Sequence, residues 1–146
     1  MEMIFATLLL AAGLAIAVAV IAQITSSASR TKINPFDFFG YFAIQSNVTA
    51  AVALLASVVF IFRGASQPAW VIYLRAIATA FMVIVELVYN TFLAGADLAG
   101  SFNVPWSNNI LHIIVPIYIL LDWVLFADQD RLSCNRLWLL LIYPIV

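Results

Sequence analysis

Four long apolar stretches constrain the fold of this chain more than any other feature. The first runs from Ile4 to Ile24 without a charged residue, and the others cover about 41–62, 70–93 and 107–126. A helix needs about 20 mostly apolar residues to cross the hydrocarbon core of a bilayer. Helices satisfy their own backbone hydrogen bonds there, without water. The sequence therefore predicts an all-α, multi-pass transmembrane helical bundle with four complete spans.

Composition supports this fold class and excludes others. Hydrophobic residues make up 66% of the chain and charged residues 9%, whereas soluble domains carry about 25% charged residues. The net charge of -1 offers no basic cluster for a nucleic acid. We expect a single integral membrane domain over 1–146, with membrane lipid as its partner and no cofactor. One histidine falls short of the three protein ligands of a typical zinc site, so no metal is expected; the oligomeric state is left open.

Both ends of the chain allow more than one interpretation. A signal peptide is the alternative for the first stretch, but Met1–Met3 supplies no positive charge and the apolar run exceeds the usual ~7–15 residues. We therefore predict a span. The last stretch, 137–146, is long enough only for the start of a fifth span, which predicts further helices beyond it.

The distribution of Lys and Arg predicts the orientation. Cytoplasmic linkers carry the excess of these residues. The first linker holds Arg30 and Lys32; the even linkers and the start of the third span hold the four others, Arg63, Arg75, Arg131 and Arg136. The N-terminus is therefore expected in the cytoplasm.

Polar side chains gather at one depth in the last three complete spans. With a rise of about 1.5 Å per residue, they lie within roughly 10 Å of the predicted outer ends. Polar groups at such depth are costly and often functional. The members of this layer are Gln45, Ser46, Asn47, Glu86, Asn90, Asn108, Asn109 and His112.

Spacing divides this layer into pairs. Glu86 and Asn90 are four residues apart, as are Asn108 and His112, so each pair shares a helix face. We expect Glu86 to pair with His112, because the sequence places no Lys or Arg at that level. Pro116 lacks an N–H and should disturb the helix at His112. The alternative for the amides is a purely structural role as hydrogen-bonding contacts between helices.

Arg75 and Asp122 form a second candidate pair. Each lies roughly 6–8 Å from the predicted inner end of its helix, and their helices are consecutive. Burying either charge alone is costly, so we predict a structural ion pair.

Four segments resemble a bacterial family of six-helix membrane proteins. YFAIQSNV (41–48) resembles its YFTIQSNLL motif, and VELVYNTFLAG (85–95) is similar to VTGLVYNLLLA. PWSNNILHIIVPIYILLDWVLF (105–126) matches a block with His, Pro and Asp-Trp at the family spacing, and WLLLIYPIV (138–146) resembles the next helix. That family is similar in turn to the androgen-induced integral membrane hydrolases of animals, which cleave fatty-acid esters of hydroxy fatty acids.

The resemblance implies about six helices, a bacterial inner membrane and a possible lipid-ester substrate. It places the hydrolases' essential histidine on His112 and its trailing proline on Pro116. Their threonine nucleophile falls on Ala43, which has no hydroxyl, and a position that is usually glycine falls on Glu86. These two departures leave open whether the chain is an enzyme.

Two functions follow as hypotheses. As a lipid-ester hydrolase, the chain would use Ser46 as nucleophile, His112 as base and Glu86 to orient the imidazole. The side chains predicted to bind substrate or the oxyanion are Asn47, Asn109, Asn90 and Gln45. The alternative is a non-enzymatic protein that binds a lipid or small molecule, or a proton-coupled carrier in which Glu86 and His112 titrate together.

Overall fold

The described part of the molecule is a bundle of membrane-spanning helices. The computed structural model describes residues 2–30, 42–93 and 104–126. They form α1 (Glu2–Arg30), α3 (Phe42–Phe62), α4 (Ala69–Val88) with η1 (Tyr89–Leu93), and α5 (Pro105–Asn109) with η3 (Ile110–Ile114) and α6 (Val115–Phe126). These helices supply four segments long and apolar enough to cross a membrane, which confirms the predicted helical bundle. The predicted fifth span at 137–146 lies outside the described residues.

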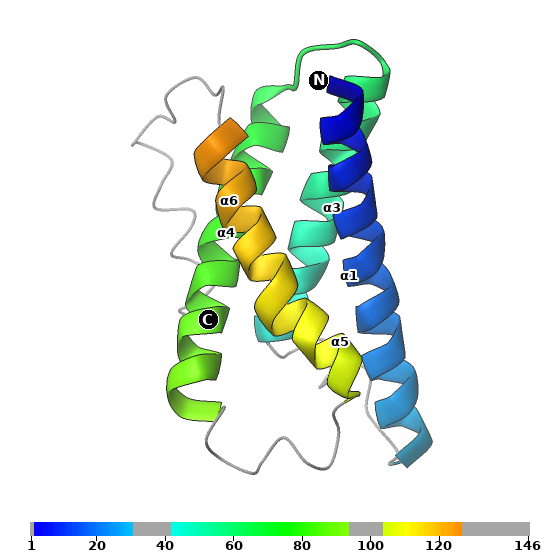
Figure 1. Ribbon diagram of the computed structural model, residues 1–146, viewed down its shortest axis with the longest axis vertical. Helices are drawn as coiled ribbons and strands as arrows, with labels where there is room; N and C mark the ends of the chain where they lie inside the picture. The colour runs from blue at the N-terminus through cyan, green and yellow to red at the C-terminus, as the bar shows by residue number, and fades with distance from the viewer. Residues whose placement is uncertain (1, 31–41, 94–103, 127–146) are drawn as a thin grey trace.

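Successive helices run up and down the bundle (Figure 1). One end, here called the turn end, carries the start of α1, the turn between α3 and α4, and the end of α6. The opposite end, here called the Asn90 end, carries the end of α1, the start of α3, η1 and α5. This alternation puts the start of α1 and the second linker on one side of the bundle, as the sequence predicted.

The first helix is longer than predicted. The apolar run stops at Ile24, but the helix continues to Arg30. Thr25 donates its hydroxyl hydrogen bond to the carbonyls of Ile21 and Ala22, at 3.0 and 3.1 Å, and Ser29 donates to Ser26. These bonds satisfy the hydroxyls within their own helix, so the segment needs no other polar partner where it continues past the apolar run.

The turn at the end of α3 is closed by a glycine. Gly64 has a φ of 61°, a left-handed conformation that glycine adopts without a Cβ clash. Its N–H donates to Ile61 and that of Ala65 donates to Phe60, both at 3.0 Å. This bonding pattern satisfies the last carbonyls of the helix. Pro68 then precedes α4.

Small residues allow α1 and α3 to pack closely. Gly13 is buried, and a Cβ built on it would lie 3.0 Å from the Leu55 side chain. Ala50 and Ala53 on α3 are also almost fully buried. In lipid, helices associate through such close contacts rather than through a hydrophobic effect between apolar faces.

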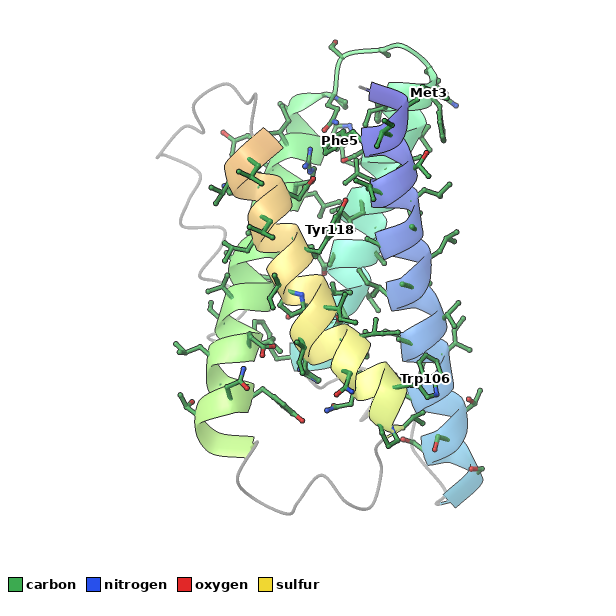
Figure 2. The ribbon with its side chains drawn as sticks, in the orientation of Figure 1. Met3, Phe5, Trp106 and Tyr118 are labelled. Atoms are coloured by element: carbon green, nitrogen blue, oxygen red, sulfur yellow. The ribbon has the colours of Figure 1, made fainter. Side chains whose placement is uncertain are left out.

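The last helical segment crosses the bundle diagonally (Figure 1). Its α6 portion lies beside α4, whereas α5 reaches α1, where the Ser107 hydroxyl donates to the Ala19 carbonyl at 2.8 Å. Ser107 is fully buried. This bond fixes the start of the segment on α1, and the crossing brings η3 past the end of α4. The side chains of these helices fill the space between the ribbons, with Tyr118 of α6 directed into the bundle (Figure 2).

Candidate functional site

Two π-helical turns lie at the Asn90 end, one on each of two neighbouring segments. η1 covers Tyr89–Leu93 and η3 covers Ile110–Ile114. In η3 the Val115 N–H donates to Ile110, five residues earlier, so the disturbance expected before Pro116 takes the form of a π turn. Such single turns are rare and frequently mark functional sites.

Two side chains bond to the backbone at the π turn that follows α4. The Asn90 amide donates to the Glu86 carbonyl at 3.1 Å, and the Thr91 hydroxyl donates to the Leu87 carbonyl at 2.6 Å. Both carbonyls are the acceptors that backbone N–H groups four residues later use in a regular helix. Bonds of the same kind occur in the regular α-helical parts of α1 and α3, so these two bonds accompany the π turn without accounting for it.

Tyr89 connects these two turns. Its ring stacks on the imidazole of His112, with ring centroids 4.2 Å apart and planes 9° apart. The Asn108 amide donates to the Tyr89 hydroxyl oxygen at 2.7 Å. Asn108 and His112 therefore share a face, as their spacing predicted, and that face meets Tyr89. We call Glu86, Tyr89, Asn90, Asn108 and His112 the Tyr89 cluster.

Glu86 does not form the predicted pair with His112. One carboxylate oxygen of Glu86 accepts from the Asn90 amide on the same helix. The other, Oε2, is buried without a hydrogen-bond partner among the described residues, and so is Nδ1 of His112. Asn90 lies one helical turn from Glu86, and Tyr89 covers a face of the imidazole. The prediction was therefore wrong about the partner of each group, although both belong to the Tyr89 cluster.

Two of the predicted site residues on α3, Ser46 and Asn47, bond to their own helix. Ser46 is fully buried, and its hydroxyl donates to the Phe42 carbonyl at 2.7 Å. Asn47 is 1% exposed, and its amide donates to the Ala43 carbonyl at 2.9 Å, while its Oδ1 has no partner among the described residues. Gln45 is half-buried on the same helix. Within the described helices, no hydrogen bond or ion pair joins Ser46 or Asn47 to Glu86 or His112.

Asn109 and Asn90 differ in their surroundings. Asn109 is exposed, whereas Asn90 is bonded to Glu86. The structure therefore brings Asn90 into the cluster, and no contact places Asn109 in it.

The predicted ion pair between Arg75 and Asp122 is confirmed. Nη2 of Arg75 contacts Oδ2 of Asp122, and the two side chains are 5% and 4% exposed. Nη1 also donates to Oε1 of Gln67 at 3.4 Å, and this oxygen lies 3.5 Å from the Ser57 hydroxyl. The pair therefore belongs to a buried polar network at the turn end.

Tyr89 is the member of the cluster that the sequence interpretation missed. It lies three residues after Glu86, so it shares a helix face with that carboxylate. A tyrosine in the last turns of a membrane span is ordinary, so its residue type alone did not single it out. Its position on the polar face of the helix was the signal that could have identified it.

Comparison with protein-family models, with curated proteins and with solved structures gave no match. Among the described residues, no three or more His, Cys, Asp or Glu side chains group as metal ligands. The Tyr89 cluster is therefore the feature of the structure from which a function can be inferred.

Proposed function

We propose that this integral membrane protein binds the polar headgroup of a lipid, or a similar amphipathic molecule, at the Tyr89 cluster. The headgroup would carry hydrogen-bond donors, as a hydroxyl or a primary ammonium does. The observation that carries the proposal is the pair of unpartnered buried atoms, Oε2 of Glu86 and Nδ1 of His112, on two segments that meet through Tyr89.

Energetics favour an external partner for these atoms. A buried polar group left without a hydrogen bond costs about 1–3 kcal/mol. An ionised carboxylate only accepts hydrogen bonds, so the missing partner of Glu86 must be a donor. Among the side chains that the structure describes, the two cations, Arg63 and Arg75, lie toward the turn end. A donor-bearing headgroup would supply the hydrogen bond that the described side chains do not.

The surroundings suit an amphipathic ligand. Val83, Leu87 and Val88 on α4 and Ile113 and Ile114 on η3 are exposed apolar side chains. They flank the polar cluster along the same two segments. Acyl chains could pack on these side chains while the headgroup reaches the carboxylate and the imidazole.

The sequence resemblance supports ester hydrolysis as an alternative function. The contacts of the described side chains give this alternative little further support. A nucleophile must lie within hydrogen-bond reach of its base, although this contact is often looser without substrate. Here the Ser46 hydroxyl donates to Phe42, and Ala43 offers no hydroxyl. Labelling by a fluorophosphonate that disappears in both Ser46→Ala and His112→Ala would favour the hydrolase instead.

We also propose that the turn end faces the cytoplasm of a bacterium, in its inner membrane. The Lys and Arg distribution supports this orientation, and the family resemblance supports the compartment. The Tyr89 cluster would then lie near the outer leaflet surface.

A lipid series can test the binding proposal. The purified protein would be exchanged into detergent with phosphatidylethanolamine or phosphatidylcholine of identical acyl chains, and retained lipid would be measured by native mass spectrometry. The two headgroups carry the same charges, but the quaternary ammonium of phosphatidylcholine has no N–H donor. We expect several-fold greater retention of phosphatidylethanolamine, reduced in Glu86→Gln.

A matched control comes from the same end of the bundle. Thr25 is exposed on α1 and bonds to its own helix, so Thr25→Val should keep the lipid preference. Equal retention of the two lipids by the unmodified protein would contradict the donor requirement. So would a preference that survives Glu86→Gln.

A further inference from the structure

The ion pair at the turn end borders a small cavity. This cavity lies between α3, α4 and α6 and has a volume of about 10 Å³. Polar groups reach it from Arg75, Thr79 and Asp122. The remaining lining is apolar and consists of Ala50, Ala53, Leu54, Ala78 and Ile119.

Asp122 leaves one oxygen unused beside this cavity. Oδ2 contacts Arg75, whereas Oδ1 is buried without a hydrogen-bond partner among the described residues. Asp122 is 4% exposed, so bulk water does not reach its carboxylate freely. A carboxylate oxygen in this position requires a hydrogen-bond donor.

The size and charge of the cavity limit its occupant. A space of this volume holds about one water molecule, which excludes an organic ligand. The positive charge of Arg75 offsets the negative charge of Asp122, so the site favours neither a free cation nor a free anion. A neutral donor and acceptor of the size of water remains.

We propose that one ordered water molecule occupies this cavity and completes the Arg75–Asp122 pair. The water donates to Oδ1 of Asp122 and to Oγ1 of Thr79. Thr79 uses its own proton on the Arg75 carbonyl at 2.9 Å, so its oxygen is free to accept. The guanidinium has five N–H donors, of which two are engaged with Gln67 and Asp122, and a third can donate to the water. Three hydrogen bonds are typical of a buried water.

This water changes the energetics of the ion pair. A dry pair in a helical bundle must offset the desolvation of both ions by their own attraction. A bridging water returns part of the lost hydration at modest entropic cost. The site is therefore a hydrated ion pair, continuous through Arg75 with Gln67 in the turn.

X-ray radiolytic footprinting can detect such a water. Radiation splits water where it is bound, and the hydroxyl radical oxidises the nearest side chains, which mass spectrometry locates. The experiment would use the full chain in lipid nanodiscs. We expect Leu54 and Ile119, which are 2% and 3% exposed, to be oxidised several-fold faster than Leu9 and Ile16, which are 0% exposed and do not line the cavity.

A cavity-filling variant provides the decisive comparison. Ala78→Val adds two methyl groups to the cavity wall and should reduce oxidation of Leu54 and Ile119 to the rate of Ile16. Ala80→Val makes the same change on the same helix at a half-buried position outside the lining, and should leave the rates unchanged. Thr79→Val, which removes one acceptor at nearly constant volume, serves as a second test if Ala78→Val does not fold. Equal oxidation of Ile119 and Ile16 in the unmodified protein would show a dry cavity and overturn the proposal.

Discussion

Replacing Arg75 by methionine should strongly destabilise the bundle. Arg75 and Asp122 are 5% and 4% exposed, so loss of the guanidinium leaves a buried carboxylate without its charge partner. Removing one member of a buried pair costs about 3–5 kcal/mol. The change also removes the donor that holds Oε1 of Gln67. We therefore expect a loss of about 3–5 kcal/mol in the free energy of unfolding.

The double variant Arg75→Met/Asp122→Leu separates the charge from the packing. Apolar side chains of similar volume often replace a buried ion pair without loss of stability. We expect the double variant to lie within about 1 kcal/mol of the unmodified protein, so the two single changes are strongly non-additive. Reversible unfolding in mixed detergent and SDS micelles, followed by tryptophan fluorescence, measures all four proteins.

Arg63→Met is the matched control, because Arg63 is exposed in the turn. Its effect should stay within about 0.5 kcal/mol. The prediction would be contradicted if Arg75→Met also cost less than about 1 kcal/mol, the range of exposed ion pairs. Simple addition of the two single effects in the double variant would refute it as well.

Three further changes test the site, the packing and the orientation. His112→Phe keeps an aromatic ring for the stack but removes both nitrogens, so the protein should stay folded by circular dichroism while native mass spectrometry shows a reduced preference for phosphatidylethanolamine. Gly13→Leu should destabilise the bundle by about 1–3 kcal/mol through overpacking, whereas Ala11→Leu on the exposed face of the same helix should have little effect in the same unfolding assay. In a Cys134→Ser background, Ser66→Cys should react with a membrane-impermeant maleimide only after the cells are permeabilised, and labelling of intact cells would reverse the proposed orientation.

The helices were predictable because their cause is local. Each apolar stretch is long enough to span the bilayer, and lipid leaves the backbone few alternatives to a helix. Arg75 and Asp122 were predictable for a related reason, because two isolated opposite charges at one depth have little choice of partner. The end of α1 was not predictable from hydropathy, since the helix continues through a polar segment in which Thr25 and Ser29 bond to their own helix.

The contacts of Glu86 and His112 required information that the sequence does not carry. The rise per residue gives the depth of a side chain, but the direction in which it points depends on an unbroken helical register. A π turn adds one residue to a turn and so rotates the later residues by about 100° around the helix axis. Here η3 contains His112, whereas η1 begins after Glu86 and affects Tyr89 and Asn90. The predicted depth therefore identified which residues lie at the same level of the membrane. It did not identify which of them contact one another.

The two polar regions of the bundle lie on one face of α4, with an apolar layer between them. Arg75, Thr79, Met82 and Glu86 succeed one another at helical spacing. Met82 is 0% exposed and packs in the core with Val115 and Ile119. Glu86 lies eleven positions after Arg75, which corresponds to about 16 Å along the helix.

This separation predicts that the two regions act independently. Substitutions more than about 7–10 Å apart without shared partners add to within about 0.5 kcal/mol. Glu86→Gln should therefore change lipid retention equally in the unmodified background and in Arg75→Met/Asp122→Leu, and its effect on unfolding should be the same in both. If the effect of Glu86→Gln on lipid retention or on unfolding differed between the two backgrounds, the apolar layer around Met82 would transmit a change between the two polar regions. That result would favour the proton-coupled carrier over a binding protein, because a carrier must link its outer and inner polar groups.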